Sequence, residues 1–135
     1  MELKIVEIEL EAHGDMKDLT EKIKKFVKES KKDTGAVLVF SVGSTGAITT
    51  IEYEPGLKKD FPRIMDKIAP YGDYYEHHKT WHDDNGSSHV KASIVGPSIV
   101  IPFVNKKLML GTWQQVVIVN FDTRARKRRV VLQIL

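Results

Sequence analysis

The chain has 135 residues, of which 41% are hydrophobic, and its 21 Lys and Arg residues outnumber its 18 Asp and Glu residues. This size suits one domain with a buried core and is too small for two ordinary domains, so we expect a single domain over residues 1–135. The sequence contains no cysteine, which excludes disulfides, thiolate metal ligands and thiol nucleophiles.

Charge and hydropathy limit the kinds of partner. No apolar run approaches the roughly 20 residues that cross a bilayer, and the first residues lack the pattern of a signal peptide. We therefore expect a cytoplasmic protein without a membrane partner. The net charge of +3 is modest, and much of the excess lies between Arg124 and Arg129, so charge alone is a weak argument for a nucleic-acid partner, and a nucleic-acid-binding module built on this basic run is the less favoured alternative.

The first third of the chain predicts a strand, a helix and a pair of strands. Apolar residues within 2–10 fit an amphipathic strand. Asp18 and Glu21 resemble a capping box, and the apolar spacing that follows predicts a helix from residue 18 to about 30. Two strands, 36–41 and 47–53, are expected to be joined at residues 43–46.

The middle of the chain predicts a second helix, a polar loop and a further strand. Asp60 and the following Pro62 indicate the first turn of a second, shorter helix, which Pro70 ends. Residues 81–89 are too polar and too rich in Gly and Ser for regular structure, so we expect a loop that carries a site. Period-two alternation over 89–94 predicts a strand that begins at His89.

The last third is dense in branched aliphatic residues. The runs 99–104, 116–121 and 130–135 predict strands that are covered on both faces. About seven strands and two helices indicate the α+β class, as a largely antiparallel two-sheet sandwich with two helices on one side.

One cluster of side chains could bind a divalent cation. Imidazole and carboxylate groups are the remaining strong metal ligands, and they gather at His77, His78, His82, Asp83, Asp84 and His89. No spacing here matches a standard zinc signature, and a solvated loop with ordinary surface histidines is the alternative. Asp83, Asp84 and Asn85 could instead hold magnesium on a diphosphate, or simply form a turn.

Two further segments could contact a ligand. Glu52 shares a strand face with Ile48 and Thr50, and a carboxylate buried there would need a cation or hydrogen-bond donors. Ser44 and Thr45 lie in a glycine turn whose amides and hydroxyls could hold phosphate, although the turn lacks the lysine of a P-loop and precedes a strand.

The indole of Trp113 could stack on a flat heterocycle, with Thr112 and Gln114 supplying hydrogen bonds. A tryptophan plug in the core or at a subunit interface is the alternative. The basic run from Arg124 to Arg129 could clamp a phosphate, but alternation with Ala125 favours a solvated strand end.

Three segments together resemble the YjbQ-like family, also called secondary thiamine-phosphate synthases. They are residues 43–57, residues 81–89, and the run Ser98–Pro102 followed by Leu108, Leu110, Gly111, Trp113 and Gln114. The resemblance extends from about Asp18 to the carboxyl terminus. It implies a sandwich fold, a homotrimer, and the condensation of hydroxymethylpyrimidine diphosphate with thiazole phosphate.

The resemblance also implies roles for particular residues. His77 and His89 match family histidines, and Glu52 matches a glutamate that lines the pocket. We assign Glu52 and His89 to catalysis, and a divalent metal, zinc or magnesium, to His77, His89, Asp83 and Asp84. The expected ligand contacts are Ser44, Thr45, Asn85, Thr112, Trp113 and Gln114. Gly43 replaces a histidine that many relatives carry, and a binding protein without turnover is the alternative function.

Overall fold

The structure is a computed structural model that describes residues 2–135. Within that range it contains eight strands and four helices. In chain order they are β1 (Leu3–Leu10), β2 (Asp15–Asp18), α1 (Thr20–Lys28), β3 (Gly35–Val42), β4 (Gly46–Ile51), α2 (Pro55–Ile68), α3 (Glu76–Trp81), α4 (Gly86–Val95), β5 (Ser98–Val104), β6 (Lys107–Leu108), β7 (Gln115–Asn120) and β8 (Arg126–Ile134). The α+β class is confirmed, but the expected two helices are four.

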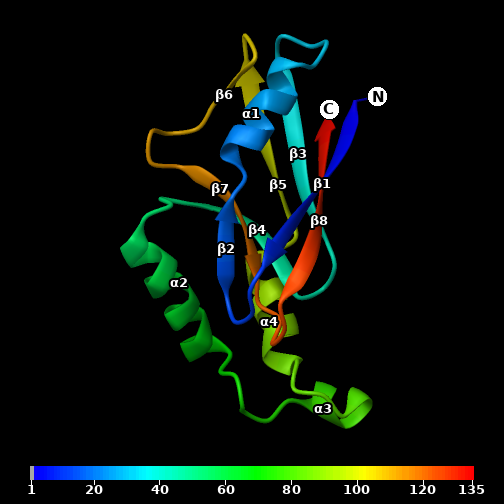
Figure 1. Cartoon of the computed structure of the whole chain (residues 1–135), viewed down its shortest axis with the longest axis vertical. Coiled ribbons are helices and arrows are strands. Elements are labelled where there is room, and N and C mark those ends of the chain that lie inside the picture. Colours follow the sequence, from blue (N-terminus) through cyan, green and yellow to red (C-terminus); the bar gives the residue numbers. More distant parts are fainter. Residues whose placement is uncertain (1) are drawn as a thin grey trace.

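The strands form two antiparallel sheets. One has five strands in the order β1-β8-β3-β5-β6, and the other has three in the order β2-β7-β4. Consecutive strands β3 and β4 therefore lie in different sheets, and the chain between them, residues 43–45, crosses from one sheet to the other (Figure 1). The chain from β7 to β8 crosses back at the same end, since Gly46 pairs with Asn120 and Val42 pairs with Arg129.

The main core lies between the sheets. Inward residues of both sheets and of α1 form one cluster that includes Val37, Val39, Leu132, Ile48, Ile118, Ile23 and Val27. The other face of the three-stranded sheet has a second cluster, in which Ala47, Val117 and Val119 pack with Met65 of α2 and Ala92 of α4. Both faces of β7 are therefore covered, as predicted for 116–121.

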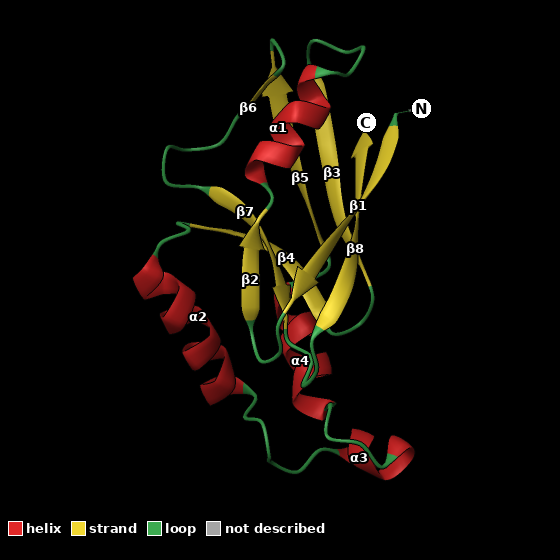
Figure 2. Ribbon diagram, viewed as in Figure 1, coloured by secondary structure: helices red, strands yellow, loops and turns green. Residues whose placement is uncertain are grey.

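The helices do not all lie on one side, so this part of the prediction is wrong. Helix α1 contributes Ile23, Phe26 and Val27 to the core between the sheets, whereas α2 and α4 cover the outer face of the three-stranded sheet. Figure 2 shows α1 at one end of the sheets, α2 alongside β2, and α3 standing away from the strands at the opposite end.

The boundaries of α1 and α2 differ from those expected. The Asp18 carboxylate accepts from the Thr20 amide at 2.8 Å, but the first turn of α1 has no side-chain cap from its N-cap residue, so there is no capping box with Glu21. Helix α2 begins at Pro55, because the Glu54 carboxylate accepts from the Gly56 and Leu57 amides. At 14 residues it is longer than α1, which has 9.

The predicted loop over 81–89 is confirmed only for residues 82–85, and the predicted strand over 89–94 is wrong. The end of α3 and the whole of α4 flank this short loop, so His89 lies on a helix. The buried face of α4 is mostly polar. Its polar groups are satisfied, since Ser87 donates to the Ala69 carbonyl and the Lys91 ammonium lies 3.0 Å from Asp66. Helix α4 therefore lacks the apolar stripe at helical spacing that marks an amphipathic helix. The apolar residues over 89–94 alternate by chance, and this alternation predicts a strand.

The outer face of the five-stranded sheet is exposed and apolar. In β5 only alternate residues are buried, so the expectation that 99–104 is covered on both faces is wrong for this chain. The exposed large apolar side chains on this face are Leu3, Ile5, Phe40, Val42, Val100 and Val104. Register brings Ile5 and Phe40 to either side of Val131, so the face is continuous across three strands.

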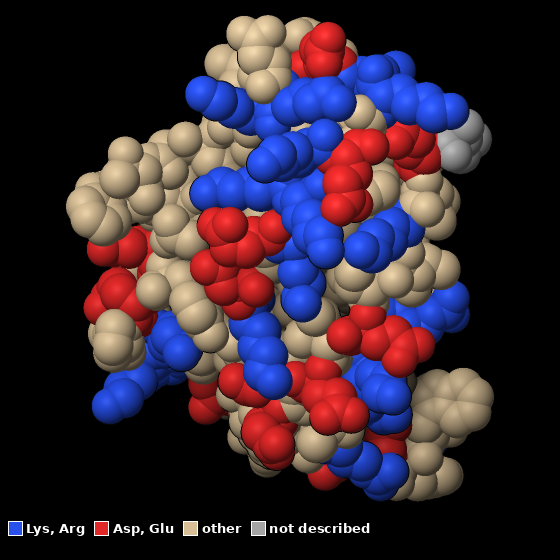
Figure 3. All heavy atoms as spheres, turned by 45° about the horizontal axis from the view of Figure 1, so that its top comes forward, with Lys and Arg blue, Asp and Glu red and all other residues tan. Residues whose placement is uncertain are grey.

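Charged side chains gather elsewhere. Figure 3 shows a band of Lys and Arg at the end that carries α1, with acidic side chains between them. Helix α1 and the residues after it supply exposed Lys22, Lys24, Lys25, Lys28, Lys31 and Lys32. None of the helices within residues 2–135 has the length and apolar character needed to cross a membrane.

Candidate functional site

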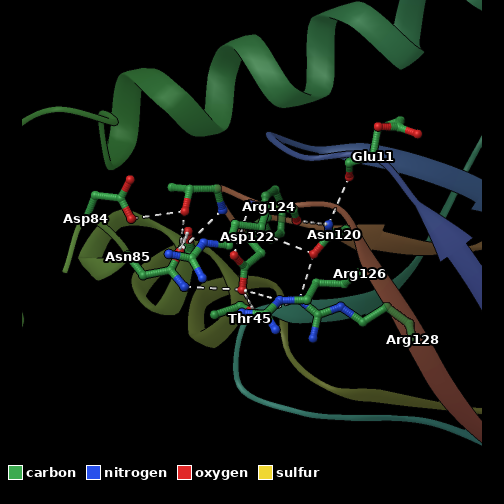
Figure 4. A network of polar contacts seen from close by, with 12 residues as sticks. Glu11, Thr45, Asp84, Asn85, Asn120, Asp122, Arg124, Arg126 and Arg128 are labelled. Carbon is green, nitrogen blue, oxygen red and sulfur yellow. Dashed lines mark hydrogen bonds and ion pairs between the residues drawn. The ribbon is translucent and has the colours of Figure 1, made fainter. Parts of the chain in front are cut away.

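A buried carboxylate, Asp122, lies at the end of the molecule where the chain crosses between the sheets. Its side chain is 2% exposed, and it lies two residues after the end of the buried strand β7. Its Oδ2 accepts from Thr45 Oγ1 at 2.9 Å, Asn85 Nδ2 at 3.2 Å and Arg126 Nε at 3.1 Å. Its Oδ1 accepts from the Arg124 amide at 3.0 Å. One carboxylate thus joins the 43–45 turn, the start of α4 and the start of β8 (Figure 4).

Local structure fixes each of these partners. The Thr45 carbonyl accepts from the Phe121 amide, which ties the turn to the end of β7. The Asn85 side chain lies just before α4, where its Oδ1 accepts from Ser88 Oγ and, at 3.3 Å, from the Thr123 amide. The Thr45 and Asn85 side chains are therefore oriented before any ligand arrives.

The hydrogen bonds keep Asp122 charged. Burial acts to raise the pKa of this carboxyl, but donation by Asn85, Thr45 and the Arg124 amide, together with the Arg126 charge, holds the pKa below 3.8. The site therefore contains a fixed negative charge at neutral pH.

Arg128 adds a buried positive charge. It is 7% exposed, and its Nη2 donates to Thr45 Oγ1 and Asn120 Oδ1. The Asn120 carboxamide is held in turn by donation from its Nδ2 to the carbonyls of Glu11 and Arg124 (Figure 4). Burial lowers the pKa of Arg128 and the Asp122 charge opposes this, so the guanidinium remains protonated at neutral pH.

Two histidines lie beside this network. His77 of α3 and His89 of α4 have ring centroids 4.5 Å apart, and His77 Nε2 lies 3.3 Å from Asp83 Oδ2. Partial burial, followed by the neighbouring His77, lowers the pKa of His89 below 6.5. His89 is therefore mostly neutral at pH 7 and can either donate or accept a hydrogen bond.

A shallow hollow of about 360 Å³ connects the two groups. Its lining comes from the 43–45 turn, from α4 and the residue before it, and from β8 and the chain that leads to it. These residues are Gly43, Ser44, Thr45, Asn85, His89, Asp122, Arg126, Lys127 and Arg128. The lining combines hydroxyl, carboxamide, imidazole and guanidinium groups. This chemistry suits a polar ligand, and the guanidinium groups favour an anionic one.

The expected metal site is only partly assembled. His77 Nε2 is buried and has no hydrogen-bond partner assigned in the described part of the chain, and it lies 3.3 Å from Asp83 Oδ2. Imidazole and carboxylate donors suit zinc. However, residues 2–135 contain no group of three His, Cys, Asp or Glu residues that could hold a metal ion. The chain by itself therefore does not supply a complete donor set.

Of the predicted site residues, seven lie in this region. Thr45 and Asn85 contact Asp122, Ser44 and His89 line the hollow, and His77 and Asp83 lie beside His89. Asp84 is linked to the network through Thr123, whose Oγ1 donates to Asp84 Oδ1 at 3.0 Å.

The other four predicted residues lie at the far end of the three-stranded sheet. Strand β4 runs from Gly46 near Asp122 to Ile51 opposite Gln115, so Glu52 is about 20 Å from Thr45 along the strand. Glu52 is exposed just past the strand end, and not on its buried face. Thr112, Trp113 and Gln114 lie in the loop before β7 at this same end.

Trp113 does not act as a core plug in this chain. Its side chain is 73% exposed. The loop is held instead by Gln114, which donates to Thr50 Oγ1 at 3.3 Å, and by Gln115, whose Oε1 accepts from the Tyr53 amide. The structure does not bring Glu52 or Trp113 to the hollow within one chain.

Sequence reasoning missed Asp122 and the burial of Arg128 within the basic run. Arg128 is buried at the site, while Arg124, Arg126, Lys127 and Arg129 are exposed, so the predicted solvated strand end holds for the run except at Arg128. A signal was present. Arg128 has the same parity along β8 as the core residues Val130 and Leu132, so period-two alternation places it on the inner face of the sheet.

Comparison with known proteins identifies the family. The sequence model of the family described as "UPF0047 protein YjbQ-like" matches residues 4–135. The chain belongs to this YjbQ-like family. A UPF0047 protein of Archaeoglobus fulgidus is 39% identical over 118 residues, covering 87% of this chain and 89% of the relative. The Bacillus subtilis protein YugU is 32% identical over 121 residues, covering 89% of each.

Solved structures of YjbQ-like and similar proteins share the fold. A hypothetical protein from Aeropyrum pernix K1 superposes with a TM-score of 0.91 at 30% identity, covering 100% of this chain and 98% of that one. A YjbQ/UPF0047 family protein from Clostridium acetobutylicum gives a TM-score of 0.88 at 32% identity, covering 98% and 99%. The resemblance seen in the sequence is thus confirmed. The descriptions of these four relatives name no activity.

Proposed function

We propose that the hollow at the 43–46 turn is an active site that binds a phosphorylated small molecule, with His89 as the group that exchanges a hydrogen bond or a proton with it. The supporting observation is the position of His89, a histidine with a lowered pKa, in a hollow whose Thr45 and Asn85 side chains are held by a buried carboxylate. Such preorganised polar groups can orient a ligand without rearranging.

The reaction we propose is the one that the family resemblance implies. The nitrogen of thiazole phosphate would attack the methylene carbon of hydroxymethylpyrimidine diphosphate. A carbon–nitrogen bond would form, and pyrophosphate would leave with the electron pair of the broken carbon–oxygen bond, while His89 would donate a hydrogen bond or a proton to the leaving oxygen. Negative charge grows on the leaving group, so donors around the hollow would stabilise the transition state more than the bound substrate. No step of this proposal passes through a metal held by the chain.

The experiment is a condensation assay with both substrates, in which thiamine phosphate and pyrophosphate are measured with magnesium present. We expect His89→Gln to reduce the rate by about 100-fold, the scale of one proton-handling group. His82→Asn is the matched control, because His82 is exposed with a φ of 53° that asparagine tolerates. Equal rates in wild type and His89→Gln, or no product from wild type, would reject the proposal.

A second candidate function is retention of a divalent metal without turnover. The buried His77 Nε2, 3.3 Å from Asp83 Oδ2, favours it, with a further ligand supplied by a bound molecule. Metal content should then be stoichiometric in wild type and lost in His77→Ala. The distant variant Glu52→Ala should keep it. Wild-type protein that takes up neither zinc nor magnesium would exclude this candidate.

A further inference from the structure

Arg128 and Arg126 lie beside the same hollow, and their charge is only half balanced. We propose that they form the receptor for a phosphate group, the end of a phosphate monoester or diphosphate, with Ser44 as a hydroxyl donor. This subsite rests on the proposed function only in using the same hollow. It assigns phosphate to the inner face of β8 and not to Asp83 and Asp84.

The first step of the argument is that Arg128 is a buried cation with neutral partners. At 7% exposure its guanidinium has lost most of its hydration, yet both of its hydrogen bonds go to uncharged oxygens, Thr45 Oγ1 and Asn120 Oδ1. Its Nε is buried and has no hydrogen-bond partner in residues 2–135. A desolvated charge in this condition is costly unless a counter-charge is added.

The second step is a count of charges. Arg126 and Arg128 extend from the same face of β8, two residues apart. Asp122 is the carboxylate next to both, and its ion-pair contact, at 3.1 Å, goes to Arg126. Lys127 also lines the hollow but is paired with Glu7 at 3.5 Å, so the two arginines share the one carboxylate of Asp122. A bound anion would balance the second cation.

The third step is access. A Cβ on Gly43 would lie 3.0 Å from Arg128 Nη1. The Nη1 end of the guanidinium therefore faces residue 43, which has no side chain. Gly43 and Ser44 are both exposed and both line the hollow with Arg126 and Arg128. Lacking a side chain, Gly43 leaves a path from solvent to the guanidinium edge. Ser44 supplies a hydroxyl at the rim.

The chemistry of the donors favours phosphate over a carboxylate ligand. Guanidinium groups present paired N–H donors that match two oxygens of a phosphate, and they stay charged at every physiological pH. Two such groups and a hydroxyl can satisfy three oxygens of one tetrahedral anion. A carboxylate has two oxygens and a single charge, so it would leave part of this receptor unused.

The test measures binding of inorganic phosphate and pyrophosphate by calorimetry and by the shift in melting temperature, against potassium chloride at matched ionic strength. Wild type should bind, and Arg126→Gln and Arg128→Gln should each weaken binding at least tenfold. Arg126 is half exposed, so that variant is expected to fold. Arg129→Gln is the matched control, because it removes an identical charge from the neighbouring, exposed position of β8.

Unchanged phosphate binding in Arg126→Gln would overturn the proposal, whatever the folding of Arg128→Gln. An equal loss in Arg129→Gln would also overturn it, since the effect would then be one of general charge. Because this assay contains neither condensation substrate, its outcome is separate from the proposed function. Arginine-dependent phosphate binding without condensation would keep the subsite and reject the reaction. Condensation that is unaffected by Arg126→Gln would keep the reaction and reject the subsite.

Discussion

Asp122 organises the site at the level of single residues. Four groups from three segments donate to its two oxygens, and Thr45 in turn connects it to Arg128. A carboxylate of this kind is expensive to bury without donors and stabilising with them. The same residue therefore supports the fold and sets the charge of the hollow.

We predict that Asp122→Asn lowers the free energy of unfolding by about 3 kcal/mol at pH 7, because Arg126 and Arg128 lose the carboxylate they share. The pKa of Asp122 is below 3.8 in the folded protein. Its stabilising effect is therefore complete above that pH and declines as the pH falls through the lower, folded value. Urea unfolding at pH 7 and at pH 3 should show a smaller gap between variant and wild type at pH 3. A gap that widens in acid would contradict the assignment.

Part of the site was predictable from residue types. Thr45, Asn85, His77 and His89 carry chemistry that is evident in the sequence, and the structure brings them close together. Asp122 and Arg128 were not evident, because their importance comes from burial, and burial depends on which face of β8 turns inward. Glu52 was misplaced because its strand ends at Ile51, one residue too early to bury it.

At the level of elements, α4 is the clearest departure from expectation. Its packed face carries Ser87, Ser88 and Lys91, so hydrogen bonds and an ion pair replace the apolar contacts that usually reveal a helix. The Lys91 ammonium also lies 3.2 Å from the centroid of the Tyr71 ring. The prediction succeeded for the strongly amphipathic α1 and for strands with regular alternation or dense aliphatic residues. In these elements apolar contacts form the packed face, so the apolar pattern in the sequence reports the structure.

The ion pair that joins α4 to α2 gives an element-scale prediction. Lys91 is 1% exposed and its partner Asp66 is 48% exposed. Asp66→Asn leaves a buried ammonium without a counter-charge and should destabilise the protein by about 2 kcal/mol, whereas Lys91→Met should stay within about 1 kcal/mol of wild type. Chemical denaturation of both variants tests the order. A larger loss in Lys91→Met would mean that the contact with Tyr71 dominates.

At the level of the whole molecule, the predicted site residues lie in two groups at opposite ends of the three-stranded sheet. The 43–46 turn and Asp122 are at one end, and Glu52 and the Trp113 loop are at the other, about 20 Å away along β4. A role for Glu52 or Trp113 in this hollow would need a second copy of the chain. The register of β4 with β7, which separates the groups, is a long-range property that local patterns do not encode.

We propose that the chain self-associates as the trimer that the family resemblance implies, through the exposed apolar face of the five-stranded sheet. Val100 is 55% exposed on this face. Val100→Glu should therefore convert a species of three times the chain mass to monomer, as measured by light scattering at micromolar concentration. Ile68→Glu, at an exposed position of α2, is the control. Monomeric wild type, or equal dissociation by Ile68→Glu, would contradict the proposal.

The chain crosses between the sheets at residues 43–45 and 121–125, and these two crossings lie side by side around Asp122. A molecule seated in the hollow would touch one crossing through Ser44 and the strand after the other through Arg126. It would act as a clasp that joins both sheets at this end and leaves the opposite end free. A bound molecule would therefore stabilise the end with the two crossings more than the other end. Local unfolding would then occur mainly at the end that carries Glu52 and Trp113.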